Sequence, residues 1–235
     1  YANLEYIIID GGSTDGSVEI IRNYENRLAF WVSEKDRGQS HAINKGLQRA
    51  TGEWVAWQNS DDIFYPDAFK RVAVAARRHP QAKLIIGDIN LIDEADRIIR
   101  DVKYVRPTYE ALLAEGMALP NQAAFWRRDL HSCVGYLNES LHYGFDYEWF
   151  LRVLGETKAT VHLPYSLGAL RYHDATKTSR SQAMFDKEYV GILEGREMPE
   201  WKKNFYRARR LFLTLANGEF RYVVRGIARR ATRSI

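Results

Sequence analysis

Apolar residues in the first ninety positions alternate between short continuous runs and longer stretches with helical spacing. A continuous apolar, β-branched run is typical of a strand that is buried on both faces. Apolar residues three and four positions apart share one face of a helix. The pattern predicts strands at 4–10, 30–33, 53–58 and 84–87, and helices at 18–24, 39–49 and 66–79.

Alternating strands and helices predict an α/β fold with a mostly parallel sheet and helices on both faces. The carboxyl ends of parallel strands meet at one edge of a sheet, and ligands collect there. In this chain the ends carry Asp10, Ser33-Glu34, the segment Asn59 to Asp62, and Asp88. We therefore expect a polar site with several carboxylates at this edge.

The second half of the chain predicts further elements and a helical tail. These are a hairpin at 89–102 with its tip at Glu94-Ala95-Asp96, helices at 108–114 and 145–154, and strands at 159–162 and 166–172. From Pro199 on, two helices are expected, split near Asn217-Gly218. The predicted organisation is a domain over 1–195 followed by a tail over 196–235.

Composition limits the class of protein. Of 235 residues, 46% are hydrophobic and 13% are aromatic, which is enough for a core and excludes a disordered chain. No apolar run approaches the ~18 residues that a membrane-spanning helix needs. A single cysteine, Cys133, excludes an internal disulfide framework and a cysteine-based zinc site. A reducing, cytoplasmic location fits this cysteine content best.

Charge is distributed unevenly along the chain. Residues 196–235 contain eleven Lys or Arg and three Glu, net +8, whereas 1–195 contain 23 basic and 27 acidic residues, net −4. The last helix of the tail combines an apolar face with a basic face that carries Arg221, Arg225 and Arg229. Such a helix suits an anionic membrane surface, and the alternative is a helix docked on its own domain. Nucleic-acid binding is not expected, because no recognisable binding motif accompanies the charge.

A polar segment, Asn59-Ser60-Asp61-Asp62, follows the strand predicted at 53–58. Carboxylates held at a rigid strand end suit Mg²⁺ or Mn²⁺, which also bind diphosphate oxygens. The alternative is a helix N-cap, in which Asp accepts backbone N–H bonds. The next helix is predicted to begin only at Pro66, so Asp61 is not at the cap position. This spacing favours a role as metal ligand over a role as helix cap for Asp61.

The loop Gly11-Gly12-Ser13-Thr14-Asp15-Gly16 lies between a predicted strand and a predicted helix, where backbone N–H groups can face an anion. Its spacing matches neither the P-loop nor GxGxxG, so a turn that caps the next helix is the alternative. Asp10 closes the strand before this loop. A carboxylate there needs hydrogen-bond donors, and a nucleotide base or ribose can supply them.

Two further side chains are candidates for catalysis and for metal binding. Asp146 lies beside the apolar stripe of the helix at 145–154, which predicts that it faces inward more than Glu148 does. A helix N-cap is the alternative for Asp146. His173 follows a predicted strand and is expected to project into the same cleft as a metal ligand. The alternative for His173 is a structural histidine.

Six motifs, in their order along the chain, resemble glycosyltransferase family 2, the inverting enzymes of the GT-A nucleotide-diphospho-sugar transferase fold. The motifs are IIIDGGSTDGS (7–17), SEKDRGQSHAINKG (33–46), ATGEWVAWQNSDD (50–62), LPNQAAFWRR (119–128), GFDYEWFLRV (144–153) and RYHDATKTS (171–179). The resemblance spans most of 1–180 and implies sugar transfer from a nucleotide-diphosphate donor, most often UDP-linked, to an acceptor hydroxyl. A glycan or lipid-linked acceptor is implied, in cell-surface polysaccharide or O-antigen synthesis at the inner membrane face.

The resemblance also implies roles for single residues. Those implied to bind the donor are Asp10, Gly12, Ser13, Asp36, Arg37, Asn59 and Asp61. Asn59 replaces the first acid of the family's DxD motif, which leaves Asp61 as the main ligand of Mg²⁺ or Mn²⁺, with His173 completing the site. Asp146 matches the catalytic base. The acceptor or sugar side is assigned to Asp88, Gln122 and Trp126.

The chain departs from the family at its start. The family usually begins with a strand and a Pro-Thr/Ser-Tyr-Asn loop, and neither precedes Tyr1. The resemblance then implies a sheet without its first strand and an incomplete base pocket, which would leave the chain inactive by itself. Together with Asn59, this departure motivates an alternative function, a non-catalytic module that binds nucleotide-sugars or glycans.

Overall fold

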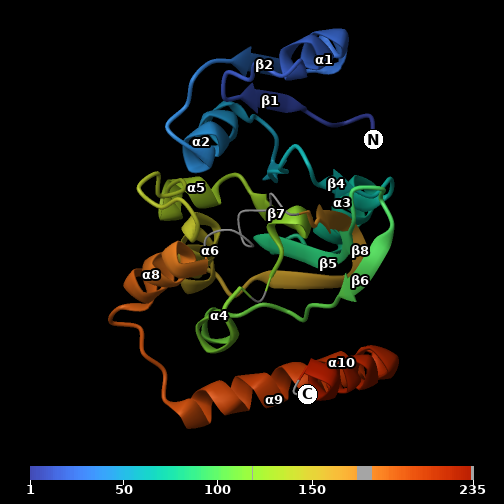
Figure 1. Cartoon of the computed structure of the whole chain (residues 1–235), viewed down its shortest axis with the longest axis vertical. Coiled ribbons are helices and arrows are strands. Elements are labelled where there is room, and N and C mark those ends of the chain that lie inside the picture. Colours follow the sequence, from blue (N-terminus) through green and yellow to red (C-terminus); the bar gives the residue numbers. More distant parts are fainter. Residues whose placement is uncertain (118, 174–181, 234–235) are drawn as a thin grey trace. The chain divides into compact units, whose positions relative to one another are not determined.

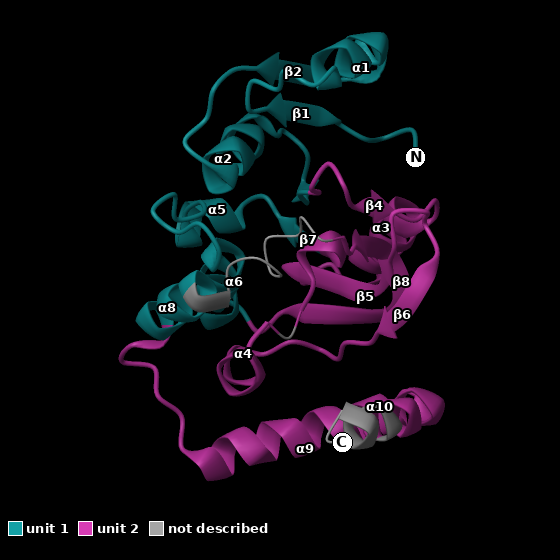
Figure 2. Ribbon diagram, in the orientation of Figure 1, with its two compact units in different colours: residues 1–57, 125–157, 174–192 teal, residues 58–124, 158–173, 193–235 magenta. Residues whose placement is uncertain are grey.

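The structure is a computed structural model that describes residues 1–117, 119–173 and 182–233, with the backbone only for 182–183 and 228–233 (Figure 1). The chain forms two compact units that are interleaved along the sequence (Figure 2). Unit 1 comprises 1–57, 125–157 and 174–192, and unit 2 comprises 58–124, 158–173 and 193–235. The tail predicted at 196–235 therefore packs as part of unit 2.

Unit 1 begins with two parallel strands and their helices. β1 (Ile7–Asp10) pairs with β2 (Phe30–Ser33), and the last residues of the two strands, Asp10 and Ser33, stand opposite each other. The helices of this segment are α1 (Ser17–Asn23), the 3₁₀ helix η1 (Glu25–Arg27) and α2 (Gln39–Arg49). β2 and α2 have the bounds that the apolar pattern predicts.

The rest of unit 1 surrounds an aromatic core. β3 (Trp54–Val55) pairs antiparallel with β7 (Ala124–Arg127) and is shorter than the strand predicted at 53–58. The remaining helices are α5 (Leu130–Val134), α6 (Phe145–Glu156) and α8 (Gln182–Leu193). The core rings belong to Trp57, Trp126, Trp149 and Phe150, with centroids 4.7 to 6.3 Å apart.

Trp126 is fully buried in this core. A buried indole N–H needs an acceptor, and Trp126 Nε1 donates to His131 Nε2 over 3.0 Å. Burial lowers the pKa of His131, which keeps the imidazole neutral and able to accept. The sequence placed Trp126 on the sugar or acceptor side, but its side chain belongs to the hydrophobic core.

Unit 2 is built on two long parallel strands, β5 (Leu84–Ile92) and β8 (Thr160–Arg171). The edge strands are antiparallel, because β6 (Ile98–Val102) pairs with β5 and β4 (Ile63–Phe64) pairs with β8. The expected parallel pairing thus holds for the longest strands, and the sheet is mixed overall. The hairpin predicted at 89–102 is confirmed, with Asp96 at a φ of 61° in its turn.

The helices of unit 2 are α3 (Ala68–Arg78), α4 (Tyr109–Glu115), the 3₁₀ helix η2 (Asn121–Ala123), α9 (Glu200–Ala216) and α10 (Phe220–Arg233). Thr108 caps α4, and its hydroxyl accepts from Ala111 N over 3.2 Å. The two predicted tail helices are confirmed, with the break at Asn217-Gly218. No helix in the described ranges combines the length and the apolar character needed to cross a membrane.

Candidate functional site

In unit 1, the carboxylate of Asp10 organises the loop that follows β1. Its Oδ2 accepts hydrogen bonds from Gly12 N (3.0 Å), Ser13 N (2.9 Å) and Ser33 Oγ (2.6 Å), and its Oδ1 accepts from Ser13 Oγ (2.5 Å). Burial raises the pKa of Asp10, but the hydroxyl and backbone donors outweigh burial and lower it to about 2. The chain thus supplies donors to Asp10 itself, from the loop after β1 and from Ser33, in place of the nucleotide donors that the sequence suggested.

The loop after β2 lies against the loop after β1. Glu34 N donates to the Asp10 carbonyl over 3.1 Å, which continues the ladder of the two parallel strands. A Cβ atom at Gly11 would stand 2.6 Å from Asp36 Oδ2, so a larger residue at this position would displace the Asp36 carboxylate. Asp36 Oδ1 in turn accepts from Gly38 N over 2.8 Å. The fold thus brings the two N-terminal segments predicted to bind the donor side by side.

Arg37, predicted beside the donor phosphates, is held by an ion pair in unit 1. Its guanidinium lies 2.5 Å from Glu139 Oε2 and remains 69% exposed. Asn44 donates to Glu139 Oε1 over 3.0 Å, and its amide also pairs with the backbone N–H and carbonyl of Leu137. The Asn44 hydrogen bond, ahead of Arg37, lowers the pKa of Glu139. The Arg37 side chain is thus a solvent-accessible cation that is paired with one carboxylate.

Asp146 is the second residue of α6 and is partly buried. Burial raises the pKa of its carboxyl to about 6, although Tyr147 N donates to Asp146 Oδ1 over 2.7 Å. Gly144 occupies the N-cap, so the alternative role of Asp146 as a helix cap does not hold. Of the two acids at the start of this helix, Asp146 is the desolvated one, and Glu148 pairs with Arg152.

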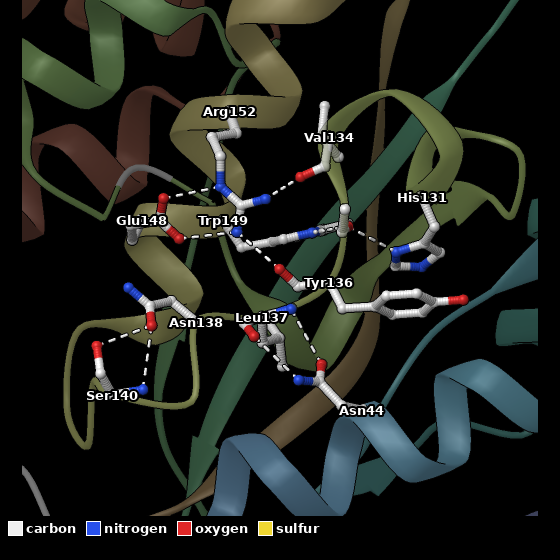
Figure 3. Close-up of polar contacts among 11 residues, drawn as sticks. Asn44, His131, Val134, Tyr136, Leu137, Asn138, Ser140, Glu148, Trp149 and Arg152 are labelled. Carbon is white, nitrogen blue, oxygen red and sulfur yellow. Dashed lines mark hydrogen bonds and ion pairs between the residues drawn. The ribbon is translucent and has the colours of Figure 1, made fainter.

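Arg152 fixes the segment that precedes α6 (Figure 3). Its guanidinium forms a two-point ion pair with Glu148, at 2.7 and 2.9 Å, and also donates to the carbonyls of Val134 and Tyr136. Planar, bidentate pairing restricts both side chains more than a single contact would. This network ties the end of α5 and the residues that follow it to the side of α6.

Glu188 of α8 anchors the turn at the start of α6. Its carboxylate accepts from three successive backbone N–H groups, of His142 (2.9 Å), Tyr143 (2.8 Å) and Gly144 (2.9 Å). Burial raises the pKa of Glu188, but these hydrogen bonds outweigh burial, so the net shift is downward. A Cβ at Gly144 would lie 2.7 Å from Ile192 Cδ1, so α8 also packs tightly on this turn.

In unit 2, Asp62 is the buried acid of the segment Asn59 to Asp62. It is 7% exposed and accepts from Arg171 N (2.9 Å), Gln122 Nε2 (3.1 Å) and Asn59 Nδ2 (3.0 Å). Burial raises its pKa, and these donors act in the opposite direction. Asn59 and Gln122, both predicted to contact the substrate, thus have a structural task in holding Asp62.

Asp61 presents its carboxylate to His173, the other residue that the resemblance assigns to the metal. Asp61 Oδ2 lies 3.2 Å from His173 Nε2, and the two side chains are 42% and 22% exposed. Arg171 secures this loop, because its Nε donates to the Asp61 carbonyl (2.8 Å) and its Nη1 donates to the Asp93 carbonyl (2.7 Å). The remainder of the motif RYHDATKTS, from residue 174 on, lies outside the described residues.

The Asp61–His173 pair fits a divalent cation that is bound together with its substrate. Within the described ranges, no group of three or more His, Cys, Asp and Glu side chains could hold a metal by itself. Mg²⁺ in phosphate-handling sites is typically held by one or two carboxylates plus substrate oxygens. An imidazole beside the carboxylate is a ligand that transition ions such as Mn²⁺ accept more readily.

Asp88 does not end a strand, and this prediction is wrong. β5 continues to Ile92, so Asp88 stands in its middle and is 1% exposed. Its carboxylate accepts from Tyr104 N (3.0 Å), lies 2.9 Å from His162 Nε2 and pairs with Lys103 Nζ (3.2 Å). Asp88 is therefore part of a buried polar network within unit 2.

Three residues that hold the loop of Asp61 or the turn before α6 were not predicted from the sequence to have a role of their own. They are Asp62, Arg171 and Glu188. Asp62 and Arg171 lie within the quoted motifs, so their position in the chain was a usable signal. Glu188 follows the last motif and had no local signal, because its partners are more than forty residues away in the chain.

Comparison with known proteins adds to this geometry. A family model described as glycosyl transferase family 2 matches residues 1–131. The chain is 28% identical over 151 residues to an uncharacterised glycosyltransferase of Mycobacterium tuberculosis, covering 63% of this chain and 56% of that protein. It is 28% identical over 140 residues to a PGL/p-HBAD biosynthesis glycosyltransferase of Mycobacterium bovis, covering 58% and 52%. The chain spans between 26% and 63% of the length of such relatives.

Two solved structures resemble the chain in fold. S. aureus TarS 1-349 in complex with UDP-GlcNAc has a TM-score of 0.66 at 16% identity, covering 92% of this chain and 64% of that one. A mannosyltransferase from Pyrobaculum calidifontis in complex with GDP-Man and Mn²⁺ has a TM-score of 0.60 at 19% identity, covering 91% and 61%. These similarities confirm the predicted GT-A fold.

Proposed function

Since this chain belongs to glycosyl transferase family 2, we propose that it transfers a sugar from a nucleoside-diphosphate donor to an acceptor hydroxyl with inversion at the anomeric carbon. The observation that carries this proposal is the raised pKa of the partly buried Asp146 carboxyl. A partly buried carboxyl with a pKa of about 6 is suited to accept a proton near neutral pH, since a general base works best when its pKa is close to the working pH.

In the proposed reaction, Asp146 accepts the proton of the acceptor hydroxyl while the hydroxyl oxygen forms a bond to the anomeric carbon. The bond between that carbon and the phosphate oxygen breaks, and its electron pair leaves with the nucleoside diphosphate. Asp61 and His173 would hold Mg²⁺ or Mn²⁺, which when bound stabilises the charge on the diphosphate. A single displacement of this kind inverts the configuration.

The donor side is assigned to unit 1 residues around the paired loops. We propose that Gly12, Ser13 and Asp36 contact the nucleoside and that Arg37 attracts its phosphates. Asp10 supports this site by holding the first loop in shape. The proteins of similar fold were solved with UDP-GlcNAc, UDP or GDP-Man, which supports a nucleotide-sugar, and we place a UDP-sugar first.

For the acceptor, we propose a glycan or a lipid-linked glycan of the cell surface. A relative named for PGL/p-HBAD biosynthesis supports this class of acceptor. We place the reaction in the cytoplasm, because Cys133 is an exposed free thiol and reducing compartments keep such thiols free.

Calorimetric titration with UDP, dTDP and GDP, with and without Mn²⁺, tests the donor site directly. We expect one nucleotide to bind, and to bind more tightly with Mn²⁺. The Asp146→Asn variant should retain this binding and lose at least ~10³-fold of the transfer rate, as expected when a general base is removed. Glu156→Gln, a change at the exposed last residue of the same helix, is the matched control for Asp146→Asn, and it should retain transfer. Loss of nucleotide binding in Asp146→Asn, or unchanged transfer, would contradict the assignment.

A second candidate function follows from Asn59. The residue at the first position of the DxD-like segment is an amide that donates to Asp62, so Asp61 is the carboxylate left for a cation. A module that binds nucleotide-sugars without turnover is compatible with this arrangement. Metal-dependent nucleotide binding without sugar transfer, from wild-type protein and a panel of acceptors, would favour that module over the enzyme.

A further inference from the structure

The two C-terminal helices expose aromatic and aliphatic side chains on the side opposite their own unit. On α9 the residues at helical spacing are Trp201, Phe205, Ala208, Phe212 and Leu215. The four large side chains are exposed: Trp201 by 71%, Phe205 by 58%, Phe212 by 69% and Leu215 by 39%. Steps of four and three residues keep all five on one face of a helix. We call these five residues the α9 stripe.

The opposite face of α9 is the one that packs on unit 2. Thr214 is 5% exposed, and Arg210 Nη1 donates to Glu115 Oε2 of α4 over 2.9 Å. Burial lowers the pKa of Arg210, but its pairing with Glu115 outweighs burial and raises it, which indicates a well-made contact. The α9 stripe is therefore an apolar surface that faces away from the core of its own unit.

α10 repeats this arrangement. Phe220, Val224 and Ile227 follow the same spacing and are 66%, 47% and 64% exposed, and we call them the α10 stripe. The start of α10 is anchored on unit 2, because Glu219 lies 2.9 Å from Lys103 Nζ. Within the described side chains, α9 thus combines an anchored face with an exposed apolar face, and α10 exposes an apolar stripe just after the anchored residue Glu219.

Basic residues flank both stripes. Residues 201–235 contain ten Lys or Arg and one acid, Glu219. Lys202 and Arg209 stand on one side of the α9 stripe, and Arg207 stands on the other. Arg221 and Arg225 are exposed beside the α10 stripe. An apolar stripe with a basic border is the pattern of a helix that lies in the plane of an anionic lipid surface.

We infer that α9 and α10 form a docking surface for a membrane that contains anionic lipids, and that the two stripes enter the headgroup boundary. The alternative occupant, a second copy of this chain, is disfavoured by charge. Two such tails, each with a net charge of +8 over 196–235, repel each other, whereas an anionic surface attracts both. This inference does not depend on the proposed sugar transfer.

Vesicle co-sedimentation of the whole chain tests the inference. We expect binding to phosphatidylcholine vesicles with ~30% phosphatidylglycerol to be at least tenfold stronger than binding to pure phosphatidylcholine, and to weaken in high salt. The double variant Phe212→Ser/Ile227→Ser should bind these vesicles at least about tenfold more weakly than the wild type, because both side chains would enter the lipid. The double variant Arg221→Gln/Arg225→Gln should bind about 10- to 30-fold more weakly than the wild type. Each Lys or Arg near an anionic membrane surface contributes about 1 kcal/mol to binding.

The matched control removes similarly exposed apolar residues from another part of unit 2. Ile98 and Ile99 of β6 are 61% and 52% exposed, so Ile98→Ser/Ile99→Ser should bind vesicles as the wild type does. Equal loss of binding in the control and in the stripe variant would overturn the inference. The inference would also be overturned if the wild type did not bind vesicles and formed a dimer in sedimentation velocity that the stripe variant dissociates.

A second measurement remains decisive if a double variant fails to fold. Brominated lipid quenches indole fluorescence at short range, and Trp201 is the exposed tryptophan of the α9 stripe. We expect quenching in the wild type and a clear reduction of it in Trp201→Phe, which retains an aromatic ring in the stripe. Identical quenching in the two proteins would show that α9 does not enter the lipid.

Discussion

The turn before α6 depends on one side chain from a distant helix, and removing it makes a quantitative prediction. In Glu188→Ala, three backbone N–H groups at residues 142–144 lose the carboxylate that accepts their hydrogen bonds at 2.8 to 2.9 Å. A hydrogen bond to a charged group contributes about 1.5–3 kcal/mol when buried. Glu188 is only partly buried, and water replaces part of what is lost, so we use about 1 kcal/mol for each bond.

The expected destabilisation is then about 2–3 kcal/mol, equivalent to roughly 5–10 °C in Tm for a chain of this size. Glu188→Gln, which keeps the shape and one acceptor oxygen, should lie between Glu188→Ala and the wild type. Urea unfolding followed by circular dichroism measures the difference. Glu194→Ala, a change at an exposed acid just after α8, serves as the control and should change stability by less than about 0.5 kcal/mol.

The lowered pKa of Glu188 predicts how the stability difference between the wild type and Glu188→Ala changes with pH. The pKa of Glu188 is lowered in the folded state, so its contribution is fully present above the pKa of the unfolded chain. It is lost as the pH falls through the lower pKa of the folded state, and the wild type and Glu188→Ala should converge in acid. Equal stability of the two proteins at pH 7, or a difference that grows in acid, would refute the reasoning.

Three further predictions follow from the site. The transfer rate should fall as the pH drops below about 6, because Asp146 must be deprotonated to accept a proton, and a pH–rate profile without this limb would contradict its role as base. Asp61→Ala should lose the Mn²⁺-dependent part of nucleotide binding in calorimetry, whereas the Mn²⁺-independent part should remain. Gly11→Ala should weaken nucleotide binding by up to about tenfold, because its Cβ would stand 2.6 Å from Asp36 Oδ2 and would displace the carboxylate that we propose contacts the nucleoside. Gly191→Ala, where no atom lies within 4 Å of the added Cβ, is the control and should bind nucleotide normally.

Elements with an uninterrupted pattern could be predicted closely from the sequence. β2 and α2 have the expected bounds, since their periodicity is complete and both ends carry turn chemistry. β8 was predicted as two strands because Pro164 interrupts the pattern. In the structure the register against β5 shifts at this point, from Gly87 opposite Leu163 to Asp88 opposite Ser166. A bulge accommodates a proline that cannot donate to the ladder, and the strand continues.

β5 also continues beyond the end that the pattern predicts, for a different reason. Asp88 and Asn90 are polar, so the apolar pattern ends at Gly87 and predicts a short strand. In the structure both side chains are buried within β5 and satisfied by partners on other elements. Burial of a polar residue is acceptable only where such partners exist, and a local pattern carries no information about them.

Residue types at short spacing were enough to identify the family and the α/β alternation of this chain. Which acids are held by the fold and which stay accessible depends on contacts between distant parts of the chain. Asp62 accepts hydrogen bonds from Gln122 and from Arg171, 60 and 109 positions away, and is buried, whereas the side chain of Asp61 stays 42% exposed. Glu188 likewise reaches across more than forty positions to the turn before Asp146. The desolvation and donors that set a carboxyl's charge state come from such long-range contacts, and the periodicity of a chain does not encode them.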